Sequence, residues 1–235
     1  MVRLGNLLFH NRNWLFPLFY LVLFIPSPEV FHNPVTAMII GFSIALTGQI
    51  IRIITIGLVY IIRGGKNRRV FADDLVTTGI FSHCRNPLYV GNILVLVGLG
   101  VASNSLIFMA IATPLFLFFY QAIVFAEENF LRNKFGQSFD EYCSRVHRWI
   151  PRLSGLGDTM RSMEFKWKRV VIREYTATYI WLTGAVLIVM KHFYVHDDRF
   201  DFSRYLPLFI ILLVVLLVLY LVTRYLKKAK IIVSD

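Results

Sequence analysis

The feature that most constrains the fold of this chain is a series of apolar segments that approach the length of a membrane-crossing helix. A helix needs about 20 apolar residues to cross the hydrocarbon core of a bilayer. The candidate segments are residues 14–25, 35–62, 88–102, 106–126, 171–190 and 205–225. The first could also be a cleaved signal peptide, but no small-residue cleavage pattern follows it. We therefore expect an all-α fold, a polytopic membrane bundle of about six transmembrane helices.

The composition supports a membrane protein and excludes several other classes. Of the 235 residues, 57% are hydrophobic and only 17% are charged, whereas soluble domains have about 25% charged residues. The two cysteines, Cys84 and Cys143, are too few for a disulfide scaffold or a four-cysteine zinc site. The net charge of +11 would suit a nucleic-acid partner, but in so apolar a chain it indicates membrane topology. We expect no nucleic-acid partner.

The basic residues are concentrated on one side of the predicted bundle. They occupy the chain ends, the connection 63–87 and the long connection 127–170, where we expect a cytoplasmic helical segment after the fourth helix. The opposite side has only Lys191, Arg199 and Arg204, and acidic residues dilute their charge. Because cytoplasmic loops are enriched in Lys and Arg, we expect both termini in the cytoplasm. The compact chain with short loops indicates a bacterial inner membrane.

The first segment with a candidate binding function is Arg85-Asn86-Pro87-Leu88-Tyr89, which opens the third predicted helix. Proline suits the first turn of a helix, where its missing N–H group leaves no hydrogen bond unmade. The unpaired amides of such a turn can bind an anion, and Arg85 adds a positive charge beside them. The alternative is that Arg85 only extends to lipid headgroups and Tyr89 is an interfacial anchor.

The second segment contains two adjacent carboxylates, Glu127 and Glu128, at the end of the fourth apolar run. Adjacent helical residues point about 100° apart, so the two side chains cannot form one acid–base pair. One can face the bundle while the other faces water or a basic partner. A helix C-terminus disfavours negative charge, which indicates a compensating cation such as a cationic ligand. The alternative is a solvated, charged helix end.

Together these two segments resemble the Arg-His-Pro-x-Tyr … Glu-Glu signature of integral-membrane methyltransferases. This group includes the isoprenylcysteine carboxyl methyltransferases and the phospholipid N-methyltransferases. Residues 75–81 match the lead-in of the signature, and residues 135–151 match its closing pattern. The resemblance indicates a single integral-membrane domain over residues 1–235, with 75–152 as its core and 171–226 as an additional C-terminal pair of transmembrane helices.

The resemblance implies transfer of a methyl group from S-adenosylmethionine to a lipid or prenylated acceptor at the cytoplasmic membrane face. It implies catalytic roles for Arg85 and Glu128. The cofactor-binding residues that it implies are His83, Arg85, Asn86, Pro87, Tyr89, Glu127, Glu128, Tyr142 and Arg148. One departure matters, because Asn86 stands where the signature has histidine, and an asparagine hydrogen-bonds but does not titrate. A binding role is therefore favoured over proton transfer at Asn86.

Arg52 is a further catalytic candidate, because an arginine inside a transmembrane helix is by default functional. With Gln49 one turn away, we expect Arg52 to bind the acceptor. The alternative is a structural ion pair with one of the two adjacent glutamates of the fourth helix. At the start of the fifth helix, Arg173 and Glu174 are expected to pair or to lie at the membrane interface.

Two other sequence features indicate packing rather than chemistry. We expect no metal site, because His83, His147, His192 and His196 lack metal-ligand spacing on a shared face. Gly98-Leu99-Gly100, inside the third helix, follows no strand, so we expect it to permit close helix packing rather than to bind a nucleotide.

Two further function classes are compatible with the sequence. Sterol reductases and steroid 5α-reductases have a similar C-terminal architecture but bind a nicotinamide cofactor. A small transporter or scaffold would bind no cofactor. The acceptor, whether a carboxylate, an amine or a thiol, and the oligomeric state are left open by the sequence.

Overall fold

The computed structural model describes residues 1–58, 72 and 74–233, and its regular elements over these residues are helices. The long helices are α1 (Val2–Val22), α2 (Pro34–Leu58), α3 (Pro87–Ala102), α4 (Thr113–Phe135), α7 (Trp167–Val195) and α9 (Phe202–Lys228). The short helices are η1 (Gly79–Ser82), η2 (Phe108–Ala112), α5 (Gln137–Arg145), α6 (Leu156–Arg161) and α8 (Asp197–Phe200). The prediction of an all-α fold is confirmed.

Within the part of the chain that the structure describes, four helical segments are long and apolar enough to cross a membrane. They are Pro34–Leu58, Phe108–Phe135, Trp167–Val195 and Phe202–Lys228. The apolar α3 has only 16 residues, a length of about 24 Å, and α1 does not reach the same apolarity because polar residues interrupt it. In α9 only 6% of the most apolar stretch is buried inside the protein, so this helix exposes its side chains to lipid. The chain is an integral membrane protein.

Two predicted helix boundaries are wrong. The first helix begins at Val2 rather than near residue 14. The fourth continues to Phe135, far beyond the predicted end at residue 126, because polar residues can extend a helix past the membrane. Glu127 and Glu128 therefore lie inside a helix, and the expected conflict with a helix C-terminus does not arise. The predicted end of the second helix at residue 62 lies outside the described residues.

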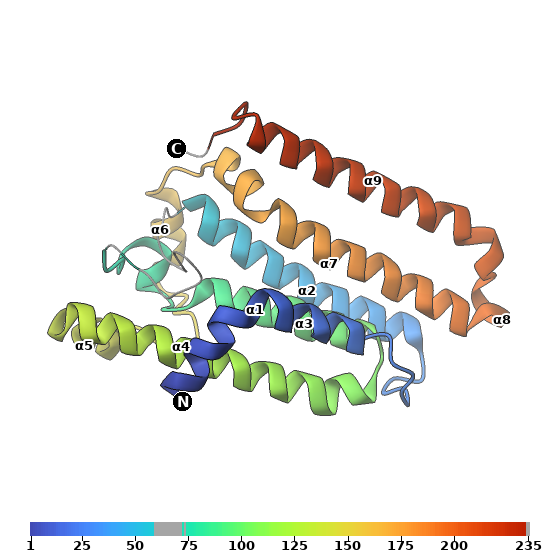
Figure 1. The fold of residues 1–235 in the computed structure, drawn as a ribbon, viewed down its shortest axis with the longest axis horizontal. Helices are drawn as coiled ribbons and strands as arrows, with labels where there is room; N and C mark the ends of the chain where they lie inside the picture. The colour runs from blue at the N-terminus through green and yellow to red at the C-terminus, as the bar shows by residue number, and fades with distance from the viewer. Residues whose placement is uncertain (59–71, 73, 234–235) are drawn as a thin grey trace.

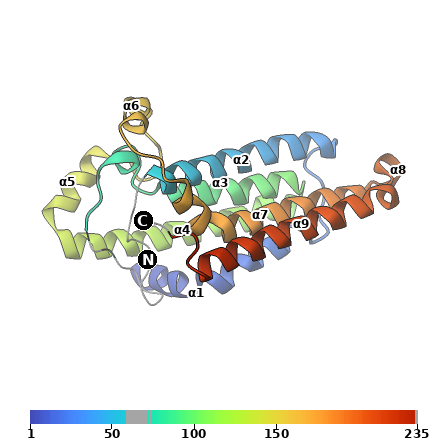
Figure 2. The ribbon, with the colours of Figure 1, turned by 90° about the horizontal axis from the view of Figure 1, so that it is seen from above.

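The long helices lie side by side along one direction, with α9 at one edge, α7 and α2 next to it, and α4 at the opposite edge (Figure 1). In a second view, α5, α6 and both chain ends are at one end of the bundle, and α8 is at the other (Figure 2). This arrangement agrees with an even number of long helices between the two termini.

The packing of α2 against α3 depends on glycine. A Cβ atom on Gly98 would lie 2.4 Å from the backbone nitrogen of Ala45 and 2.5 Å from the carbonyl oxygen of Gly41. The two backbones therefore approach as closely as small residues allow, and the predicted packing role of Gly98 is confirmed. Gly100 serves a different neighbour, since a Cβ atom there would meet the ring of Phe108 at 2.3 Å.

Changing Gly98 to alanine should lower the free energy of unfolding by about 1–3 kcal/mol, because the added methyl group meets backbone atoms that cannot rotate away. The matched control is Gly157→Ala in α6, where a Cβ atom has nothing within 4 Å. Thermal unfolding in detergent compares the two variants. Equal melting temperatures would contradict the close approach of α2 and α3.

Candidate active site

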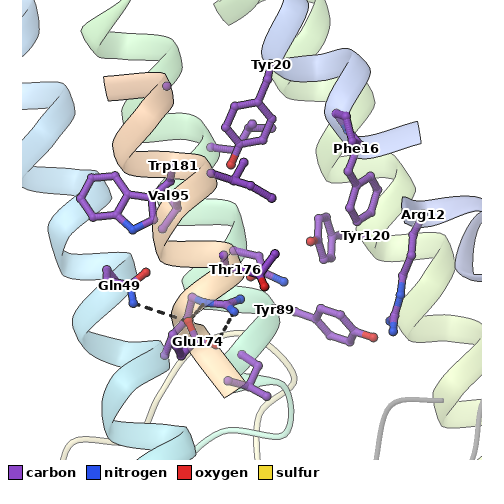
Figure 3. A pocket seen from close by; sticks show the side chains of 18 of the residues that line it. Arg12, Phe16, Tyr20, Gln49, Tyr89, Val95, Tyr120, Glu174, Thr176 and Trp181 are labelled. Atoms are coloured by element: carbon purple, nitrogen blue, oxygen red, sulfur yellow. Dashed lines mark hydrogen bonds and ion pairs between the residues drawn. The ribbon is translucent and has the colours of Figure 1, made fainter. Parts of the chain in front are cut away.

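A cavity of about 1130 Å³ lies among α1, α2, α3, α4 and α7. Five of the catalytic and cofactor-binding candidates from the sequence line it: Arg52, Asn86, Pro87, Tyr89 and Glu127. The remainder of the wall is largely aromatic and aliphatic. Figure 3 shows Tyr89 and Tyr120 on one side of this space and Gln49 with Glu174 on the other. Its volume is slightly above the usual range for ligand-binding pockets, about 300–1,000 Å³.

Glu127 and Tyr89 form the polar wall between α3 and α4. The Tyr89 hydroxyl donates a hydrogen bond of 2.5 Å to Oε1 of Glu127, whose exposed fraction is 3%. The tyrosine ring also packs edge-on against Tyr120, with 5.2 Å between the ring centroids. Arg12 of α1 lines the cavity as well and lies near Tyr89 (Figure 3). Nothing in the sequence singles out Arg12 as a cavity residue, since it stands near the chain end among other polar residues.

Arg52 forms a bidentate ion pair inside the bundle. Its Nε and Nη2 atoms donate to the two carboxylate oxygens of Glu174 in α7 over 2.9 and 2.6 Å. The side chains are only 14% and 4% exposed. An ion pair was the alternative to acceptor binding for Arg52, and the structure shows one, but its partner is Glu174 rather than a glutamate of the fourth helix. Glu174, expected to pair with its neighbour or to lie at the membrane interface, is instead buried inside the bundle. The physical reason is that α2 packs against α7, which turns the two charges toward each other.

Glu128 is held between two arginines. Arg148 donates to its carboxylate over 3.1 and 2.5 Å, and Nε of Arg85 lies 3.2 Å from Oε1. The Arg85 side chain also donates to the backbone carbonyls of Cys143 and Val146, each over 3.0 Å. The structure thus brings together the two segments of the methyltransferase signature. These three charged residues lie beside the cavity, while their neighbours Asn86 and Glu127 line it.

His83, Tyr142 and Asn86 tie this region together through hydrogen bonds. The two ring nitrogens of His83 lie 2.7 Å from the Arg152 carbonyl and 2.9 Å from the Thr159 hydroxyl. Tyr142 donates to the Phe81 carbonyl over 2.7 Å, and Asn86 donates to the Arg148 carbonyl over 3.3 Å. These contacts position the N-terminus of α3, where Pro87 occupies the first turn as predicted.

Neither cysteine has the character of a nucleophile. Burial raises the pKa of the Cys84 thiol, and it also raises the pKa of the Cys143 thiol. A raised pKa keeps both sulfurs protonated at neutral pH, and the thiol is far less reactive than the thiolate.

Two histidines at the C-terminal end of α7 do share a face, contrary to expectation: His192 lies in the helix and His196 directly follows its last residue. His192 and His196 are one helical turn apart, and their rings lie 6.1 Å apart with 14° between the planes. A spacing of four residues places two side chains on the same side of a helix. Both lie near the C-terminal end of α7, away from the signature segments.

Comparison with known proteins decides the family. The phospholipid methyltransferase family matches residues 35–138, which include Arg52, Tyr89 and Glu127. The chain is 32% identical over 164 residues to the cobalt-zinc-cadmium resistance protein CzcN of Cupriavidus metallidurans, covering 69% of this chain and 68% of that protein. The chain belongs to the phospholipid methyltransferase family. The resemblance found in the sequence is thereby confirmed.

Further relatives show similar identity over shorter stretches. The nickel-cobalt-cadmium resistance protein NccN of Alcaligenes xylosoxydans xylosoxydans is 32% identical, with 60% of this chain and 62% of that protein covered. Protein-S-isoprenylcysteine O-methyltransferase B of Arabidopsis thaliana is 33% identical, with 47% and 57% covered. The chain thus spans less than two thirds of these two relatives. No solved structure matches the chain significantly.

Proposed function

We propose that the protein is a membrane methyltransferase that transfers a methyl group from S-adenosylmethionine to a lipid-like acceptor. The observation that carries the proposal is the cavity inside a phospholipid methyltransferase family bundle, lined by Glu127, Tyr89 and the Arg52–Glu174 pair. The acceptor is either a carboxylate, as in isoprenylcysteine, or the amine of a phospholipid.

The residues at the cavity fit the proposed methyl donor. A sulfonium donor supplies an already activated methyl group, so the reaction needs alignment rather than a covalent enzyme intermediate. Alignment of the donor and the acceptor can lower the activation barrier by about 7–11 kcal/mol. The buried Glu127 carboxylate supplies negative charge for the cationic part of the donor. The first turn of α3, at Pro87 and Leu88, borders the cavity and offers amides to an anionic group.

The rest of the cavity suits an acceptor with an apolar tail and a polar head. Aromatic and aliphatic side chains of α1, α4 and α7 form most of its wall. Among the described residues, Gln49 Oε1, Trp181 Nε1 and Thr183 Oγ1 are buried without a hydrogen-bond partner, and all three residues line the cavity. Leaving such an atom unpaired costs about 1–3 kcal/mol. A polar acceptor group would relieve this cost, with Arg52 holding a carboxylate or a glutamate accepting the proton of an amine.

We place the active site on the cytoplasmic side of a bacterial inner membrane. The chain ends lie at the same end of the bundle as α5 and α6 (Figure 2). Arg148, Lys227 and Lys228 belong to segments at this end, whereas the connection after α7 contains Asp197 and Asp198. The basic end is the cytoplasmic one in most membrane proteins.

The test is transfer of isotope-labelled methyl groups from S-adenosylmethionine into a lipid extract by the full-length protein in detergent. Glu127→Gln should weaken donor affinity about 10- to 100-fold in calorimetry, because a charge-assisted contact contributes about 1.5–3 kcal/mol. Glu141→Gln, an exposed change in α5, is the matched control and should have no effect.

Three outcomes would contradict the proposal. Consumption of NADPH with a lipid extract, without methyl transfer, would favour the reductase alternative. Absence of binding to either cofactor would favour a transporter or scaffold. Equal donor affinity in Glu127→Gln and Glu141→Gln would remove Glu127 from the donor site.

A further inference from the structure

We propose that Glu29, His192 and His196 form a binding site for a divalent transition-metal ion such as Zn²⁺. The site lies where the α1–α2 connection meets the C-terminal end of α7. It is at the far end of α3 from Tyr89, since His192 contacts Ala102, the last residue of that helix. The inference does not rest on the proposed methyltransferase activity.

The three side chains converge closely enough to share one ion. Their potential ligand atoms all lie within 4.8 Å of one another. Nε2 of His196 is 2.9 Å from Oε1 of Glu29. In a tetrahedral zinc site with bonds of about 2.0–2.1 Å, ligand atoms are about 3.3 Å apart. The His196–Glu29 pair is therefore already near the separation that a metal imposes, and a side-chain rotation brings His192 to the same ion.

His192 has the hydrogen-bonding pattern of a metal-binding histidine. It is only 2% exposed, and its Nε2 atom lies 2.8 Å from the carbonyl oxygen of Ala102. A carbonyl only accepts, so Nε2 carries the proton and Nδ1 keeps a free lone pair. Histidines that bind metal almost always donate their other ring N–H in this way, because the bond fixes the tautomer and the ring orientation.

The backbone holds Glu29 in place from the other side. Asn104, which is 2% exposed, accepts hydrogen bonds from the amides of Val30 and Phe31 over 3.1 and 2.8 Å. Its side-chain amide donates to the Phe31 carbonyl over 2.8 Å. The backbone of Glu29 also pairs with that of Ser105 in an isolated antiparallel β-bridge. The carboxylate therefore extends from a fixed segment, which lowers the entropy that metal binding would otherwise cost.

The charges and donor atoms favour a transition metal. Glu29 supplies a negative charge, and the nearby Lys191 ammonium donates to the carbonyls of Leu23 and Ser103 over 3.1 and 3.3 Å. These two carbonyl oxygens offset part of the repulsion between the Lys191 ammonium and a bound metal ion. Two imidazoles and one carboxylate suit Zn²⁺, with water as the fourth ligand. Mg²⁺ and Ca²⁺ prefer oxygen ligands and serve as control ions.

The experiment uses the full-length protein in detergent and Zn²⁺ as the probe. Competition with a chromogenic chelator should give one Zn²⁺ per chain, and Zn²⁺ but not Mg²⁺ should raise the melting temperature, because a ligand stabilises the folded state that binds it. His196→Lys places a group beside Glu29 that can still pair with it but removes an imidazole ligand, and it should weaken Zn²⁺ binding at least tenfold. Glu29→Gln should do the same, whereas His10→Ala, an exposed change in α1, should not.

The wild-type protein also provides a readout that needs no variant. Co²⁺ bound at this site should give the visible absorption of a tetrahedral complex, and Zn²⁺ should displace it. The proposal is overturned if the wild type binds no Zn²⁺, or if His196→Lys and Glu29→Gln bind it as tightly as His10→Ala does.

Discussion

Replacing Glu128 by glutamine is expected to lower the free energy of unfolding by about 3–5 kcal/mol, the usual loss when one partner of a buried ion pair is removed. The carboxylate is 4% exposed and lies between Arg85 and Arg148. Without its charge, two guanidinium groups face each other in a buried region. Donor affinity should fall as well, since these arginines connect the α3 N-terminus to the segment after α5. Chemical unfolding in detergent measures the loss.

The control for Glu128 is an exposed ion pair of the same region. Arg132 and Asp140 are 2.7 Å apart, but their side chains are 51% and 56% exposed. Exposed pairs contribute only about 0–1 kcal/mol, so Asp140→Asn should change stability little. A double variant, Glu128→Gln with Arg85→Met, should lose less than the sum of its single changes, because residues in contact are coupled. A loss for Glu128→Gln no larger than for Asp140→Asn would contradict the buried cluster.

Replacing Arg52 by methionine should reduce methyl transfer at least about 100-fold, the equivalent of about 3 kcal/mol or more. The change leaves the Glu174 carboxylate buried without its bidentate partner. Part of the effect is loss of stability, so the single variant does not separate a structural role from acceptor binding. Both quantities, the melting temperature and kcat/KM for the lipid acceptor, are measured.

The double variant Arg52→Met with Glu174→Met separates the two roles. Replacing both members of a buried ion pair by apolar side chains is often neutral for stability, so the melting temperature should return toward that of the wild type. If Arg52 holds the acceptor, kcat/KM should stay low. Full recovery of both quantities would show that the pair is structural only and would contradict the acceptor-binding role.

Much of the candidate site was predictable because it is encoded in short segments. Residues 85–89 open a helix in the structure, as the position of Pro87 indicates. The Tyr89–Glu127 contact joins the two halves of the signature. By contrast, the sequence did not indicate Glu174 as the ion-pair partner of Arg52; the alternative considered was a glutamate of the fourth helix. Whether an arginine in one helix meets a carboxylate in another depends on how the two helices are rotated about their axes.

The sequence by itself determined that the chain is helical and lies in a membrane, because the length and apolarity of a segment decide whether lipid can surround it. It also determined the family, through two short motifs. Only the tertiary structure decided which polar side chains meet: Glu128 with two arginines, Arg52 with Glu174, and Glu29 with His196. These partners are separated by up to 167 residues along the chain. The physical reason is that contacts between helices depend on packing, which no local pattern encodes.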